Sequence, residues 1–76
     1  MMKVEYDKSS DSAYIYLCEI GPGEVSSTYP CNPLEVHGMI NLDFDKDGLL
    51  IGIEVIDASK KLPPSILESA SIISQQ

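Results

Sequence analysis

The sequence contains no arginine, and its five lysines are outnumbered by twelve aspartates and glutamates, which gives a net charge of −7 over 76 residues. Proteins that bind nucleic acids place cationic side chains against the phosphates, so this charge balance argues against nucleic-acid binding. The same balance is compatible with a basic protein as partner, because opposite charges steer two proteins toward each other.

Long hydrophobic segments and paired cysteines are missing too. No apolar run approaches the roughly 18 residues of a membrane-spanning helix, and the chain does not open with the basic and apolar regions of a signal peptide. Cys18 and Cys31 show no CxxC or other paired spacing, so we expect two reduced thiols. Together these absences predict a cytoplasmic protein without membrane association.

Catalytic motifs are absent as well. The sequence has no G-x-S-x-G, no phosphate-binding loop and no H-E-x-x-H motif. His37 is the only histidine, and a lone histidine without a nucleophile or ligand cluster is usually structural or solvated. We therefore expect a protein that is not an enzyme and that holds no cofactor.

The shortness of the chain limits its core. A domain of this size removes only about 60% of its unfolded surface from water, and small domains commonly gain stability from a disulfide, a metal or a partner chain. With no disulfide or zinc pattern present, we expect one domain over residues 1–76 that self-associates as a homo-oligomer. Apolar residues on both faces of residues 13–18 favour the same expectation.

The strongest structural signal lies in residues 40–57, where two apolar-alternating segments flank Asp-Lys-Asp-Gly at 45–48, a pattern typical of a β-hairpin. Side chains alternate along a strand, so Leu42 is expected on one buried face with Ile51 or Ile53. Asp43 and Asp45 should then lie outside. The opposite face would carry a mixed set: Asn41, Asp43, Leu50, Gly52, Glu54 and Ile56.

The length of the hairpin loop decides this register. A loop of two or four residues ending at Gly48 keeps both apolar sets on one face. A three-residue loop with a glycine bulge would set Phe44 against Leu50 and turn Asp43 and Asp45 toward the apolar side, where unpaired carboxylates are costly. We therefore expect an even loop, with Gly48 at positive φ.

Three other segments have the pattern of strands: residues 3–7, 13–18 and, more weakly, 24–29 at a sheet edge. Residues 29–33 read as a loop. The tyrosines of 13–18 are expected on the less buried face, with their hydroxyls in water. Gly52, inside a strand, needs either a tyrosine from 13–18 lying over it or a bulge.

A helix is predicted for residues 64–74, after two prolines that stop the sheet region of residues 1–59. Ser65 and Glu68 fit a capping box at its start, and apolar residues follow at helical spacing. The predicted fold is thus α+β: an antiparallel sheet of four or five strands, mostly a meander around the central hairpin, with one short C-terminal helix.

The hairpin also matches the calcium-loop pattern D-x-D-x-D-G-x5-E in full, and its candidate ligands are Asp43, Asp45, Asp47 and Glu54. Calcium loops have a helix on each side, whereas both flanks here have the period of strands. We therefore expect no metal site and keep calcium binding as the alternative function.

The leading hypothesis is a protein-interaction module that binds a basic protein. Charge would steer the encounter, and nearby apolar residues would hold the complex. The predicted partner surface consists of Asp43, Asp45, Asp47, Leu50, Glu54 and Ile56.

The chain resembles a small prokaryotic family known as domain of unknown function 2283. The residues that carry the resemblance are Tyr6-Asp7, the segment from Asp11 to Leu17, the segment from Asp43 to Gly48, Gly52-Ile53-Glu54 and Asp57-Ala58-Ser59. The section from Gly21 to His37 is longer than the family's usual connection, and the predicted helix lies outside the match. The family has no established activity, but some members resemble partners of small ribonuclease-like toxins by gene arrangement, so the resemblance implies an antitoxin-like role.

Overall fold

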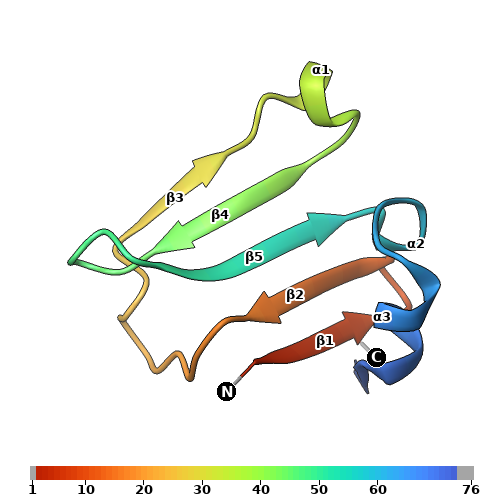
Figure 1. Ribbon diagram of the computed structural model, residues 1–76, viewed down its shortest axis with the longest axis horizontal. Helices are drawn as coiled ribbons and strands as arrows, with labels where there is room; N and C mark the ends of the chain where they lie inside the picture. The colour runs from red at the N-terminus through yellow and green to blue at the C-terminus, as the bar shows by residue number, and fades with distance from the viewer. Residues whose placement is uncertain (1, 74–76) are drawn as a thin grey trace.

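The computed structural model describes residues 2–73, which form a sheet of six strands with three short helices (Figure 1). The strands are β1 (Lys3–Asp7), β2 (Ser12–Tyr16), β3 (Ser27–Pro30), β4 (Ile40–Phe44), β5 (Leu50–Ile56) and β6 (Ser71–Ile73). The helices are α1 (Pro33–Val36), α2 (Ala58–Lys61) and α3 (Pro64–Ser69). The α+β class predicted from the sequence is confirmed.

The strands lie in the order β3-β4-β5-β2-β1-β6. Neighbours are antiparallel except β1 and β6, which run parallel, so the sheet is mixed. The connection from β2 to β3 passes β5 and β4 to reach the far edge, which a simple meander would not do. The predictions of four or five strands, of an antiparallel meander and of one helix are therefore wrong. β6, α1 and α2 are too short to leave a periodic signal in the sequence.

The central hairpin forms where it was predicted, and Leu42 lies opposite Ile53 as expected. Its loop, however, has three residues and not an even number. The Asp45 amide donates to the Leu49 carbonyl at 2.9 Å, and the Gly48 amide donates to the Asp45 carbonyl at 3.0 Å. Gly48 has φ +81°, the positive value that this glycine-bulge loop requires.

A second irregularity in β5 cancels the effect of the odd loop. Phe44 pairs with Leu50 while Asp43 pairs with Gly52, so Ile51 is an extra residue on β5. The odd loop and the bulge each shift the pairing by one residue. Together they leave Asp43 on the polar side of the sheet, although the loop has three residues. Residue parity excludes a three-residue loop only when β5 is regular, and this bulge makes β5 irregular. Directly paired residues share a face, so Leu50 lies with Phe44 on the apolar face, and its predicted place beside Asp43 is wrong.

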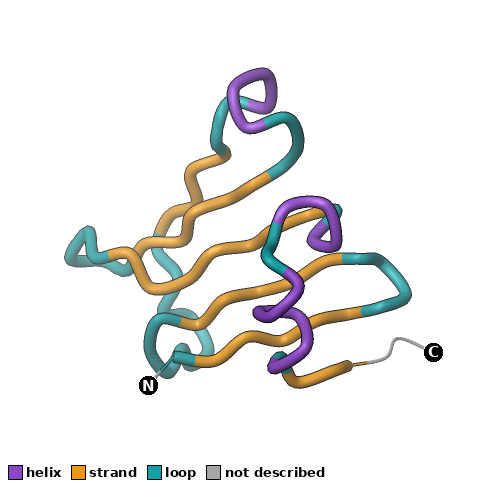
Figure 2. Tube along the Cα trace, turned by 45° about the vertical axis from the view of Figure 1, so that its right-hand side comes forward, coloured by secondary structure: helices purple, strands orange, loops and turns teal. Residues whose placement is uncertain are grey.

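One face of the sheet is apolar, and the helices cover only part of it. α2 packs on β2 and β5, and α3 packs on β1, so both helices lie over one end of the sheet (Figure 2). Ala13, Val55 and Ala58 are at most 3% exposed and form the centre of the core. Leu62 and Leu67 pack against them from the helical layer.

The C-terminal helix differs from the predicted one over residues 64–74, the last of which lies outside the described residues. Pro63 occupies the N-cap position, with no side-chain hydrogen bond to the helix. Ser65 does not cap, because Pro64 has a φ preset for the first helical position and begins the helix earlier. Ala70 is extended and ends the helix, and β6 then pairs along β1. The free hydrogen-bonding edge of β1 favours this strand over a longer helix.

The segment between β2 and β4 forms an arm at the edge of the sheet. The weak strand expected there exists as β3, at the edge. The loop expected over residues 29–33 is wrong at both ends, because Tyr29 and Pro30 belong to β3 and Pro33 begins α1. The Asn32 side chain accepts a hydrogen bond from the Leu34 amide at 2.9 Å, and His37 closes the helix in the left-handed conformation, with φ +55°. His37 thus holds a structural position.

Candidate functional site

The face of the sheet opposite the helices carries polar side chains, with two tyrosines at its centre. The rings of Tyr14 and Tyr16 meet edge to face, with centroids 4.7 Å apart. The Lys3 ammonium lies 4.6 Å from the centroid of the Tyr16 ring and 3.5 Å from the Glu5 carboxylate. The pairing of the strands places these residues on what we call the polar face: Lys3, Glu5, Tyr14, Tyr16, Asn41, Asp43, Gly52 and Glu54.

Both phenols donate hydrogen bonds to carboxylates on other strands. Tyr14 donates to Asp43 at 2.6 Å, and Tyr16 donates to Glu5 at 2.9 Å. Burial, reinforced by the bond to Asp43, raises the pKa of Tyr14 far above its ordinary value. Burial and the bond to Glu5 raise the pKa of Tyr16 in the same way. The hydroxyls that the sequence placed in water are therefore held by acidic partners.

Two acids of the predicted partner surface, Asp43 and Glu54, lie on the polar face and are both half-buried. Asp43 also accepts a hydrogen bond from the Thr28 hydroxyl at 2.6 Å, and Glu54 accepts one from the Asn41 amide at 2.8 Å. Ile56 follows on the same face of β5. The structure thus brings three of the six predicted residues to one side of the sheet, with both carboxylates fixed by neighbours.

The other two acids lie in the hairpin turn. The Asp45 carboxylate accepts hydrogen bonds from the Asp47 and Leu49 amides at 2.9 and 3.0 Å, so it stabilises the turn itself. Asp47 is exposed. Strands flank this turn, and β5 carries Glu54 away from it. Within residues 2–73 no three His, Cys, Asp or Glu side chains are grouped to hold a metal ion, so the geometry gives calcium binding no support.

A groove of about 530 Å³ opens between the hairpin turn and the loop that follows β2. Its lining comprises Cys18, Glu19, Gly23, Glu24, Ser26, Asp45, Lys46, Asp47 and Ile51, and we call it the acidic groove. Four of these residues are acids and one is a lysine. Glu19 and Glu24 were missed in the sequence, because only the path of the β2–β3 connection brings them beside the turn. A bond of 2.7 Å from the Gly21 amide to Glu24 holds the loop.

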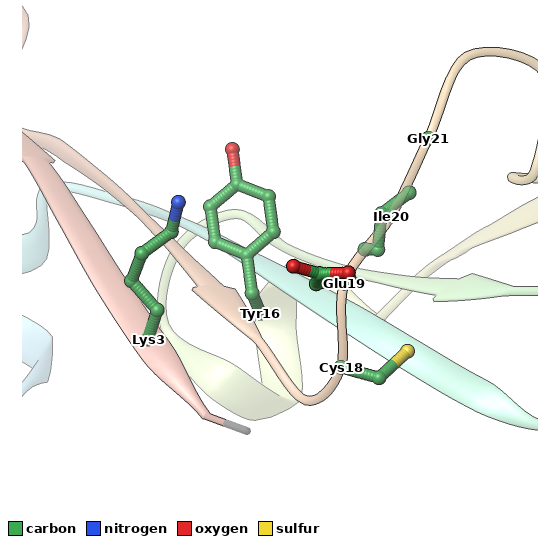
Figure 3. A pocket seen from close by; sticks show the side chains of 6 residues that line it. All are labelled: Lys3, Tyr16, Cys18, Glu19, Ile20 and Gly21. Carbon is green, nitrogen blue, oxygen red and sulfur yellow. The ribbon is translucent and has the colours of Figure 1, made fainter.

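A second hollow, of about 330 Å³, joins the acidic groove to the polar face. Its lining comprises Lys3, Tyr16, Cys18, Glu19, Ile20 and Gly21. Figure 3 shows the Tyr16 ring standing between the Lys3 amine and the Ile20 side chain. Since Cys18 and Glu19 line both hollows, the acidic groove and the polar face form one continuous surface.

A separate cluster ties α2 to the first hairpin. Asp11 accepts hydrogen bonds from the Tyr6 hydroxyl at 2.7 Å, from the Ser59 amide at 3.0 Å and from the Ser59 hydroxyl at 2.7 Å. The bond from Tyr6, followed by those from Ser59, holds the pKa of Asp11 below its ordinary value. The Ala58 amide also donates to the Asp11 carbonyl at 2.9 Å. Tyr6, Asp11 and Ser59, which carry part of the family resemblance, therefore hold α2 against the first hairpin.

Comparisons with known proteins agree with that resemblance. No curated protein and no solved structure gives a significant match to the chain. In the described part of the chain, every helix is too short or too polar to cross a membrane. One family model, described as a protein of unknown function (DUF2283), matches residues 3–59. This range runs from β1 to Ser59 and includes both the cluster around Asp11 and the hairpin turn. The chain therefore belongs to the DUF2283 family.

Proposed function

We propose that this protein is a non-enzymatic interaction module that binds a basic protein through its acidic groove and the adjoining polar face. The observation that carries the proposal is the convergence of Glu19 and Glu24 with Asp45 and Asp47 around one groove. These acids come from two segments that the sequence separates. Their clustering concentrates negative potential where a cationic side chain of a partner can enter.

Apolar atoms beside the acids support the proposal. Ile51 is one of the residues that line the groove and is 6% exposed. Leu49, on the turn beside the groove, is 63% exposed. Interfaces gain most of their affinity from a few desolvated apolar anchors, and charged rims mainly set the rate and selectivity of encounter. The groove supplies the charges, and Leu49 on the adjoining turn supplies an exposed apolar side chain. An antitoxin-like role against a basic toxin is the most specific form of this proposal, and the family resemblance alone suggests it.

Two double variants, one in the groove and one control, test the proposal. The groove variant is Glu19→Gln with Asp47→Asn, which removes two charges from the groove. It spares Asp43, which holds Tyr14, and Asp45, which holds the turn. Each variant and the wild type serve as bait in pull-downs from native lysate, with mass spectrometry of the retained proteins at low and high salt. We expect the groove variant to retain less of one basic protein, and high salt to weaken retention by the wild type.

The control is Glu35→Gln with Glu68→Gln, which removes the same charge from exposed positions on α1 and α3. This control should retain the basic protein as the wild type does. The proposal fails if the wild type retains no protein, or if the groove and control variants retain the same proteins equally.

A further inference from the structure

We infer that the protein forms a homodimer in which the uncovered part of its apolar face packs against the same face of a second copy. This inference is independent of the proposed function, which uses the opposite face. It develops the expectation of self-association by naming the surface. We call that surface the open face, and it consists of Ile15, Tyr29, Leu42, Phe44 and Leu50.

The pairing of the strands arranges the apolar face in rows. The row of Ala13, Val55 and Ile40 lies under the helices, and its first two members are 3% and 2% exposed. The next row runs from Ile15 through Ile53 and Leu42 to Tyr29, and it ends at a side chain that is 60% exposed. A third row pairs Phe44 with Leu50, which is 37% exposed.

The layer that buries the first row does not reach the other two. α2 packs on β2 and β5, and α3 on β1, so no helix lies over β3 or over the part of β4 beyond Ile40 (Figure 2). In the described chain no large side chain is fully buried. Contiguous apolar surface of this kind usually marks an interface.

The distribution of charge identifies the occupant as a second copy. None of the five residues of the open face is charged, and the acids of the sheet lie on the polar face or in the turn. A basic partner finds no counter-charge on the open face. Two copies packed through the open face keep their acidic polar faces on the outside of the dimer. The two sheets would lie about 10 Å apart, and salt largely screens the repulsion between charges that are farther apart than this. Homodimer interfaces are also the more apolar class.

The mass of the full-length protein in solution tests the inference. Tyr29→Glu with Leu50→Glu places charges at the two most exposed positions of the open face. Leu34→Glu is the control for an added surface charge, since Leu34 is 85% exposed on α1 and lies outside that face. Sedimentation equilibrium over a concentration series should give a dimer for the wild type and for the control. We expect self-association of the double variant to weaken at least about tenfold, because each introduced charge must be desolvated.

Nuclear magnetic resonance on a mixture of isotope-labelled and unlabelled wild type gives a readout that needs no variant. Intermolecular NOEs to the methyl groups of Ile15 and Leu42 are expected. A monomer mass at every concentration would overturn the inference and leave the open face to a different protein. A double variant that is folded by circular dichroism and dimerises like the wild type, or NOEs confined to other faces, would overturn it as well.

Discussion

The phenol ring of Tyr14 lies directly over the backbone of Gly52 and reaches across β5 to donate a hydrogen bond to Asp43 on β4. A Cβ atom at position 52 would come within 2.8 Å of ring carbon Cε2, and closer still to the phenol oxygen. The absence of a side chain at Gly52 is therefore what lets β2 and β4 be bridged across the strand between them. The sequence left two explanations for Gly52, a tyrosine lying over it or a bulge, and the structure has both, because the extra residue Ile51 is its neighbour.

Replacing Gly52 with alanine should destabilise the protein by about 1–3 kcal/mol, the usual cost of forcing extra atoms into a packed site. The methyl group would displace the Tyr14 ring and break its bond to Asp43. Urea unfolding followed by circular dichroism measures the loss. The same substitution in a Tyr14→Ala background should cost much less, because the clashing ring is gone. Equal costs in the two backgrounds would show that Tyr14 does not limit this position.

The Asp11 cluster should make stability sensitive to acid. The native state lowers the pKa of Asp11, chiefly through the hydrogen bond from Tyr6. The stabilisation is therefore present above the unfolded pKa of about 4 and is lost as pH falls through the native value. Asp11→Asn should lower the melting temperature at neutral pH and flatten its decline in acid. Ser59→Ala should act in the same direction. An unchanged decline in Asp11→Asn would contradict the assignment.

Alkaline stability should depend on Tyr14 with the opposite sign. Burial and the bond to Asp43 raise the pKa of this phenol, so the native state favours the neutral form. Its contribution is present below the unfolded pKa of about 10 and declines as pH rises through the native value. Tyr14→Phe keeps the ring over Gly52 but cannot ionise. Its melting temperature should fall less steeply than that of the wild type above about pH 10, and an equally steep fall would contradict this account.

Calcium should leave the melting temperature unchanged. A ligand that binds only the native state raises stability by about 2.7 kcal/mol at a hundredfold excess over its dissociation constant. Asp45 already accepts two backbone hydrogen bonds in the turn, and strands hold Glu54 away from it. Thermal melts with millimolar Ca²⁺ and with Na⁺ at equal ionic strength should coincide. A rise specific to Ca²⁺ would restore calcium binding as a function.

The sequence predicted the strands well where the signal is local. Residues 3–7 form β1 as expected, and the apolar alternation around Leu42 and Ile53 fixed which residues face each other. Parity alone did not fix the loop, because the bulge at Ile51 offsets the odd count. Leu50 was placed on the wrong face for that reason.

Features that depend on distant segments could not be predicted. β6 exists because Ser71 lies beside Glu5, and nothing near Ser71 in the sequence indicates that edge. The acidic groove likewise depends on the crossing from β2 to β3, which carries Glu19 and Glu24 to the hairpin turn. Chain topology, and not residue pattern, assembled the site.

The strand order also sets the sequence of events by which the chain can fold. β1 with β2 and β4 with β5 are local hairpins, but β2 finds its second partner only in β5, where Ser12 pairs with Ile56. Pairing between such distant segments forms slowly, because a long loop must close first. During synthesis β2 emerges before β5 exists, and one edge of it stays unpaired until then. Incomplete chains therefore expose the unpaired edge of β2. An exposed strand edge can pair with another chain, so incomplete chains are prone to aggregate through it.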